Sequence, residues 1–214
     1  MTARVSSVFL TSITMAAGMA LIHAAAPASA QVDVSCIVRS DIIPVEGRAS
    51  PLDSVTFRVA GQEVKICYGR PSARGRTMLG NPGVEGAGSQ MGVVPFGKIW
   101  RTGANEPTLL RTPIALVIAG VSVPAGTYSI YTVPGEAEWQ IIVNRSYSQW
   151  GQERTYTDEV RAQEVERGKV SSERMDSHVE TFTIRAEDLS DGTVQVILEW
   201  ERTRVSVPIS AGGK

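Results

Sequence analysis

The chain has 214 residues, which is the length of one domain or of one domain with an appendage. Its hydrophobic share of 43% and its charged share of 20% are ordinary for a globular protein and exclude a disordered chain or a collagen-like repeat. The formal net charge is -1, which excludes nucleic acid as the default partner, because phosphate binding needs an excess of basic residues.

The first thirty residues have the features of a secretory signal peptide. Arg4 is their only charged residue, an apolar stretch runs from Val8 to Ile22, and Ala28-Ser29-Ala30 is an Ala-x-Ala cleavage pattern. A membrane anchor is the alternative, but the apolar run is interrupted and falls short of the roughly 20 residues of a spanning helix. We therefore expect residues 1–30 to be removed, leaving a periplasmic or secreted chain that starts at Gln31 and does not span a membrane.

Cys36 and Cys67 are the two cysteines, and export would place them where disulfides persist. A bond between them would close a loop of about 30 residues and contribute on the order of 3 kcal/mol in the loop-entropy model. In the alternative, Cys67 is a small buried apolar residue and Cys36 lies in a loose leader. Residues 31–50 show no clear period, and we expect a leader or a single first strand there.

From residue 51 to residue 210, short apolar runs alternate with turn signals. A hairpin is expected around Ala60-Gly61-Gln62, and the run Ile114–Ile118 is apolar on both faces, which is typical of a central strand. In most later strands one face is apolar and the other polar, so we predict a single all-β domain, an antiparallel β-sandwich or jelly roll, with a tail at 211–214. The expected strands are 55–59, 63–68, 114–118, 121–123, 127–133, 139–143, 181–186, 194–201 and 205–209.

Two segments do not fit this pattern of strands. Gly80–Gly92 carries five glycines and few large side chains, so we expect a surface loop. Residues 158–167 are rich in helix formers and precede Gly168, a natural helix stop, which favours a short helix. The neighbouring segments are strands, however, and tertiary pairing can override local propensity, so helix and strand both remain open.

Residues that commonly carry catalysis or bind metals are scarce. Loss of the signal peptide also removes His23, which leaves His178 as the only histidine. A Ser or Cys nucleophile usually needs a histidine base, and His178 lies next to no glycine elbow. A zinc site needs three or four ligands, which no His/Cys spacing supplies. We predict no catalytic residue, no metal and no cofactor; an enzyme would have to use carboxylates such as Glu106 together with an arginine.

Positive charge is concentrated in one part of the chain. Residues 64–105 contain six cations and one acid, which gives this stretch +5 and the remaining mature chain -7. The cations lie among turn residues and planar side chains, and the Arg guanidinium is a bidentate partner for carboxylate or phosphate. The predicted ligand-binding residues are Tyr68, Arg70, Arg74, Arg76, Arg101, Asn105, Glu106 and Trp150.

These residues have two competing interpretations. In the first, their loops form a pocket at one end of the sandwich for a small polar or anionic ligand or a glycan. In the second, Arg70 and Arg101 pair internally with Glu106 or another acid and hold two loops together, as buried Arg–carboxylate pairs often do. The protein is then a structural or interaction module of the cell envelope without a small-molecule site. Trp139 and Trp200 lie in alternating strands and are expected in the core.

Several blocks of the sequence together have a recognisable pattern. They are Tyr68-Gly69-Arg70-Pro71-Ser72 with Arg74-Gly75-Arg76, the run VPFGKIWRTGANE from Val94 to Glu106, Pro124-Ala125-Gly126-Thr127-Tyr128, Gln149-Trp150-Gly151 and Val179-Glu180-Thr181-Phe182. From about residue 49 to residue 209 the chain resembles the bacterial exported-protein family catalogued as domain of unknown function 2911. The resemblance implies an exported, mostly β domain, favours a strand at 158–167, and implies no activity and no catalytic residue.

Overall fold

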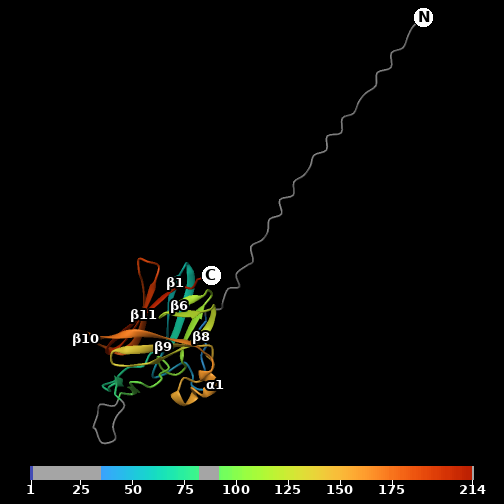
Figure 1. The fold of residues 1–214 in the computed structure, drawn as a ribbon. Coiled ribbons are helices and arrows are strands. Elements are labelled where there is room, and N and C mark those ends of the chain that lie inside the picture. The colour runs from blue at the N-terminus through green and yellow to red at the C-terminus, as the bar shows by residue number, and fades with distance from the viewer. Residues whose placement is uncertain (2–34, 82–91, 214) are drawn as a thin grey trace. The chain divides into compact units, whose positions relative to one another are not determined.

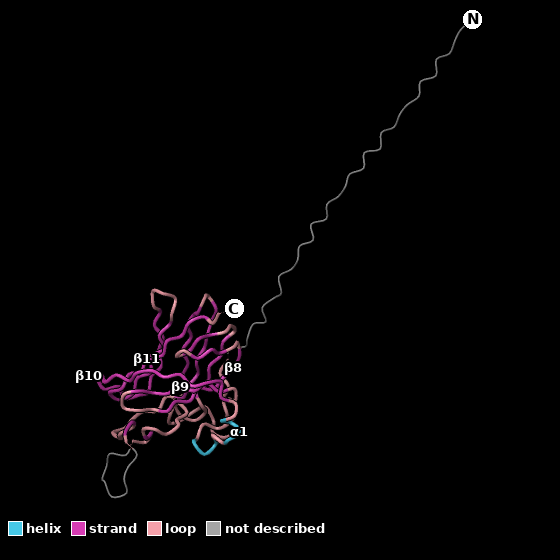
Figure 2. The backbone as a smooth tube through the Cα atoms, in the orientation of Figure 1, coloured by secondary structure: helices cyan, strands magenta, loops and turns pink. Residues whose placement is uncertain are grey.

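The computed structural model describes Met1, residues 35–81 and residues 92–213. The expected signal peptide and most of the expected loop at residues 80–92 lie outside the described residues. Strands dominate the described chain, together with the short helices η1 (Glu153–Thr155) and α1 (Asp158–Arg161), as Figure 2 shows. The strands are β1 (Leu52–Val59), β2 (Gln62–Gly69), β3 (Leu79–Gly80), β4 (Val94–Pro95), β5 (Thr108–Thr112), β6 (Leu116–Ile118), β7 (Val121–Val123), β8 (Gly126–Val133), β9 (Glu138–Asn144), β10 (Glu164–Asp188) and β11 (Val194–Ala211).

Strands β1 and β2 form the predicted hairpin. Val59 pairs with Gln62, so the turn consists of Ala60 and Gly61 alone. The φ angles of these two residues are 48° and 77°. Positive φ at both central positions is the mark of a type I′ turn, whose twist matches that of the flanking strands.

One long sheet folds over to make both layers of the domain. Its strand order is β1-β2-β5-β8-β9-β10-β11-β6-β7, and every neighbouring pair is antiparallel. The 25-residue strand β10 belongs to both layers, because residues 164–171 pair with β9 and residues 172–188 pair with β11. Strand β1 lies against β10 and β11, so the two layers face each other (Figure 1). The predicted all-β, antiparallel sandwich class is confirmed.

The core between the layers has an aromatic centre. Trp100, Trp139, Phe182 and Trp200 are all buried. The rings of Trp100 and Trp200 stack with centroids 5.5 Å apart and 17° between their planes, and Phe182 meets Trp100 edge-on at 5.0 Å. Such pairs add to the stabilisation from area burial alone. Trp139 and Trp200 are core residues as predicted, and Trp100, which the sequence placed in a candidate binding loop, joins them.

The segment that the sequence left open contains both structures. Thr157 caps the single turn of α1 by accepting a hydrogen bond from the Val160 amide, and Glu164 then begins β10. Local propensity therefore determines the first four residues, and pairing with β9 determines the rest.

Two other segments differ in detail from the sequence-based expectations. The apolar run at 114–118 forms a strand only from Leu116, and it lies next to the edge strand β7 rather than at the centre of the sheet. Residues 35–50 run as turns and irregular chain and form no strand.

Candidate functional site

A disulfide joins the segment before β1 to strand β2. Cys36 and Cys67 are bonded, with their Cα atoms 5.8 Å apart and 31 positions between them in sequence. The predicted bond is confirmed. It brings residues 35–50 to the end of the sandwich where Tyr68–Arg76 and Trp100–Glu106 lie. We call these two stretches the Arg-rich segments.

Glu106 makes the most buried ion pair at this end, and its partner is Arg48. The Glu106 carboxylate receives hydrogen bonds from Nη1 and Nη2 of Arg48 at 2.9 and 3.1 Å, and from the Arg39 amide at 2.5 Å. The Arg48 side chain is 1% exposed and that of Glu106 is 12% exposed. The remaining Arg48 donors reach the carbonyls of Pro44 and Ile43. Glu106 is thus occupied by a residue that the sequence analysis did not single out.

Arg70 and Arg74 also make internal contacts. Arg70 forms an ion pair with Asp53 at 3.2 Å and donates to the carbonyl of Phe182 and the hydroxyl of Thr183. Arg74 has a φ of 52° and donates from its side chain to the carbonyl of Ala49.

Arg76 turns back on its own loop. Its guanidinium donates to the carbonyls of Ala73 and Ser72, both at 3.0 Å. These bonds close the turn that follows the Tyr68–Ser72 block, and they use the backbone rather than an acidic side chain.

The loop from Trp100 to Glu106 packs its backbone directly on two other loops. A Cβ added to Gly69 would lie 2.1 Å from the carbonyl oxygen of Ala104, and one added to Gly151 would lie 2.8 Å from that of Asn105. The positive φ of Asn105 (67°) belongs to this tight arrangement. Only glycine permits such an approach, which gives Gly69 and Gly151 a packing role.

Arg101 lies within this packed region. It donates from Nη1 to the carbonyl of Asn105 at 3.0 Å, and burial lowers the pKa of its guanidinium. Asn105 donates from its side chain to the carbonyl of Ser50. Trp150 is half-buried, and its carbonyl accepts a hydrogen bond from Thr155.

Tyr68 is buried in the sheet between the same loops. Its hydroxyl accepts from the Ile184 amide at 2.9 Å, and burial raises the pKa of the phenol. The structure therefore brings the eight predicted binding residues to one end of the sandwich. It holds them there by internal hydrogen bonds, ion pairs and backbone packing.

Comparison with protein-family models assigns the chain to a family. Residues 50–209 match the family described as a protein of unknown function, DUF2911. The chain belongs to this family. No curated protein and no solved structure matches it.

The blocks that resemble this family coincide with the contacts between loops. The Pro71 carbonyl accepts from the Phe182 amide, and Ser72 bonds through its hydroxyl to Thr181, which ties the first block to the Val179–Phe182 block. Gly69 against Ala104 ties the first block to the Trp100–Glu106 block. These parts of the family pattern thus have a physical role in holding the fold together.

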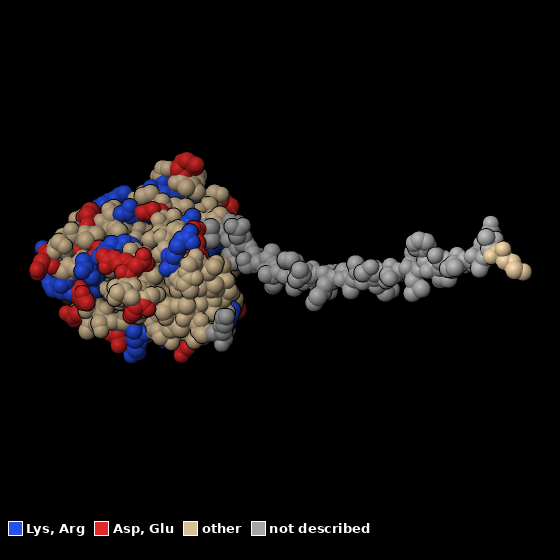
Figure 3. All heavy atoms as spheres, turned by 90° about the horizontal axis from the view of Figure 1, so that it is seen from above, with Lys and Arg blue, Asp and Glu red and all other residues tan. Residues whose placement is uncertain are grey.

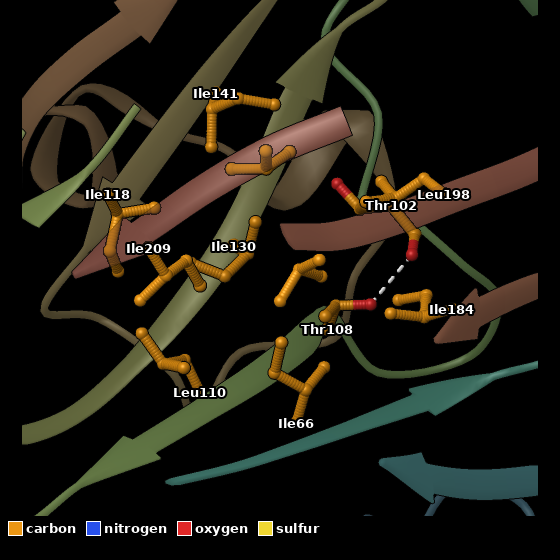
Figure 4. A pocket seen from close by; sticks show the side chains of 12 residues that line it. Ile66, Thr102, Thr108, Leu110, Ile118, Ile130, Ile141, Ile184, Leu198 and Ile209 are labelled. Atoms are coloured by element: carbon orange, nitrogen blue, oxygen red, sulfur yellow. Dashed lines mark hydrogen bonds between the residues drawn. The ribbon is translucent and has the colours of Figure 1, made fainter. Parts of the chain in front are cut away.

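A small apolar cavity lies inside the sandwich, shown in Figure 4. Its volume is about 30 Å³, room for about two water molecules. Isoleucines from both layers, including Ile66, Ile141 and Ile184, point toward one another across it, and the hydroxyl of Thr108 donates to the carbonyl of Thr102. The size and lining are those of a gap in core packing.

A larger, polar cleft lies where β10 and β11 bend. Its volume is about 570 Å³, which is in the range of small-molecule sites. The walls come from β3 and its flanks, Phe96, the turn between β8 and β9, β10 and β11. We call it the His178 cleft, and its polar lining includes Thr77, Glu136, Glu173, Arg174, His178 and Arg202.

His178 owes its position to an irregularity in β10. Between the pairs Arg174–Thr203 and Val179–Glu201, the chain advances five positions along β10 but two along β11. Three extra residues of β10 are therefore accommodated opposite β11. His178, the sole histidine of the expected mature chain, lies within this bulge. Bulges of this kind often re-aim side chains beside functional sites.

Glu201, opposite the bulge, adopts a strained backbone conformation. Its φ is 52°, in the left-handed region that is costly for a residue with a side chain. Its carboxylate accepts hydrogen bonds from the amides of Met78 and Leu79 at 3.0 and 2.9 Å. These bonds hold the strained turn and attach β3, which forms one wall of the cleft.

The charged groups of the cleft differ from those of the Arg-rich loops. Among the residues that the structure describes, the side chains of Arg174 and His178 make no hydrogen bond or ion pair, and the side chain of Arg202 donates only to the carbonyl of Asp176. Across the face seen in Figure 3, acidic and basic side chains are interspersed beside a broad area without charge.

The sequence did contain a signal for this site. The run from Ser171 to Ser177, polar except for Met175, breaks the alternation expected of a strand, and the only histidine of the expected mature chain follows it. In residues 35–81 and 92–213 no three His, Cys, Asp or Glu side chains are grouped to hold a metal ion. No helix within those ranges is long and apolar enough to cross a membrane.

Proposed function

We propose that this protein is a periplasmic or secreted domain that binds a small polar ligand in the His178 cleft. The observation that carries the proposal is a polar cleft of about 570 Å³ that is lined by Arg174, Arg202 and His178, the last of which lies in the irregularity of β10. Natural ligand sites combine such a volume with a few polar groups on a rigid scaffold. Here β10 and β11, the two longest strands, supply that scaffold.

The Arg-rich end is the weaker candidate for the same function. Arg70 is engaged with Asp53, and Glu106 is engaged with Arg48. A ligand at this end would have to displace internal hydrogen bonds. A ligand in the His178 cleft would instead meet the guanidinium groups of Arg174 and Arg202, which make few internal hydrogen bonds. We infer that the Arg-rich loops hold the fold together.

A structural or interaction module of the cell envelope is the second candidate. It is favoured by the same internal contacts, since the blocks that resemble the family serve packing at one end of the sandwich. This function requires no occupant of the cleft.

A ligand screen on protein expressed from the full-length chain separates the two candidates. The panel contains neutral sugars, amino acids, dicarboxylates, citrate and inorganic phosphate, and the readout is the midpoint of thermal unfolding. A ligand present at 100 times its Kd stabilises by about 2.7 kcal/mol, which raises Tm by roughly 5 to 10 °C for a domain of this size.

Two tryptophan substitutions locate the binding site. Thr77 is exposed and lines the cleft, so Thr77→Trp fills it, whereas Thr56→Trp adds the same side chain to an exposed position on β1. We expect ligand shifts to survive Thr56→Trp and to disappear in Thr77→Trp. If no panel member shifts Tm, or if Thr77→Trp leaves every shift intact, the cleft is not the binding site and the structural candidate is preferred.

A further inference from the structure

We infer that the ligand of the His178 cleft carries a carboxylate or phosphate group, held between Arg174 and Arg202. The inference rests on the proposed function and specifies the chemical class that the cleft selects. It comes from the two guanidinium groups that line the cleft and from the ways in which the nearby acids are occupied.

The two arginines come from paired strands at adjacent positions. Arg174 of β10 lies opposite Thr203 of β11, and Arg202 is the residue next to Thr203. Both line the same cleft, and both are exposed. Both carry a positive charge, and an anion bound between them would accept charge-assisted hydrogen bonds from each.

Most of their donors are available to a ligand. The side chain of Arg174 makes no hydrogen bond or ion pair within the described part of the chain, and Arg202 donates from Nη1 to the carbonyl of Asp176. Guanidinium offers five N–H donors in a planar fork that matches carboxylate or phosphate oxygens. The two side chains therefore offer several N–H donors to an anion with two or three oxygens.

The nearby acids do not neutralise this pair. Glu201 keeps its negative charge, but both of its carboxylate oxygens accept hydrogen bonds from the backbone amides of Met78 and Leu79 and none from an arginine. A carboxylate oxygen of Glu180 accepts from the Arg74 amide. Glu136 and Glu173 line the cleft but form no ion pair with either arginine in residues 35–81 and 92–213.

These two remaining acids shape the selectivity of the cleft. They can accept hydrogen bonds from hydroxyl groups of the same ligand, such as the hydroxyl of citrate.

The test measures binding of citrate, inorganic phosphate and glucose to the exported full chain by isothermal titration calorimetry at low ionic strength. Arg174→Gln and Arg202→Gln remove one charge each from the cleft. Arg154→Gln is the matched control. Arg154 is exposed on η1 outside the cleft, and its substitution removes the same charge. Thermal unfolding of each variant checks that it is folded.

We expect citrate or phosphate to bind the unchanged chain and Arg154→Gln alike. Each cleft variant should weaken that binding at least ten-fold, and the double variant should abolish it. Binding of citrate alone or phosphate alone identifies the preferred anion. The ring protons of His178, followed by nuclear magnetic resonance, should shift on anion addition, since this residue lines the cleft.

The outcomes separate the inference from the proposed function. Glucose binding that Thr77→Trp blocks, without anion binding, overturns the inference and keeps the proposed function. If Arg154→Gln weakens anion binding as much as the cleft variants do, the loss reports a general effect of charge. That result also overturns the inference. If none of the panel ligands binds in the cleft, both fail together.

Discussion

The buried pair of Arg48 and Glu106 gives the sharpest test of how the Arg-rich end is held together. The Arg48 side chain is 1% exposed, and all three of its nitrogens donate inside the protein. Replacing Glu106 by Leu would leave that guanidinium buried without its carboxylate. Removing one partner of a buried pair costs about 3 to 5 kcal/mol, because the surviving charge has no compensation.

The double substitution separates the charge effect from packing. Arg48→Met together with Glu106→Leu removes both charges and keeps most of the volume, so we expect it to cost less than Glu106→Leu alone. Arg48→Met alone should cost less than Glu106→Leu alone, because the Glu106 carboxylate is more exposed and keeps the Arg39 amide.

Urea unfolding at pH 7 with the disulfide intact measures the free energy of unfolding of the unchanged protein, the two single variants and the double variant. The slope m is compared between them. A Glu106→Leu cost below 1 kcal/mol would refute the reasoning, as would a double variant that loses the full sum of the single costs. Glu106→Gln adds a functional comparison. If Glu106 instead served a ligand, this variant would keep its stability and lose binding.

Three further predictions follow from the described contacts. Gly69→Ala should prevent folding or lower Tm by more than 10 °C in a thermal melt, because its Cβ would meet the Ala104 carbonyl at 2.1 Å, whereas Gly213→Ala meets nothing within 4 Å and should leave Tm unchanged. Reduction of the disulfide should lower the free energy of urea unfolding by about 3 to 4 kcal/mol, and an unchanged midpoint would contradict its place in the fold. Burial raises the pKa of Tyr131 to about 12, so its neutral form is favoured in the folded state. Its contribution of on the order of 2 kcal/mol should be complete below pH 10 and lost between pH 10 and 12, and the decline should be less steep in Tyr131→Phe.

The parts of the fold that the sequence predicted are those with a local cause. The β1–β2 hairpin follows from alternation around Ala60-Gly61, and burial of Trp139 and Trp200 follows from their places in alternating strands. Residues 158–167 show the limit of this reasoning, because propensity produced only the four residues of α1 before pairing with β9 took over.

The candidate site was only partly accessible to the same reasoning. Of the two interpretations that the sequence left open for the Arg-rich segments, internal contacts such as that of Arg70 with Asp53 favour the structural one. It did not identify Arg48 as the partner of Glu106, because the two are 58 positions apart and no local pattern links them. The His178 cleft was missed for a related reason, since its walls come from segments separated by up to about 125 positions.

By itself the sequence determined an all-β chain, through the alternation and the turn residues of its strands, together with a pair of cysteines able to form a disulfide. Tertiary structure alone decided which arginines pair with groups inside the protein and which keep N–H donors without an internal partner. Alternation and turn chemistry depend on neighbours in the chain, whereas the partner of a charge depends on whichever distant segment the fold brings beside it. Arg70 and Arg174 look alike in the sequence, and only the fold gives Asp53 to the first and leaves the second facing a cleft.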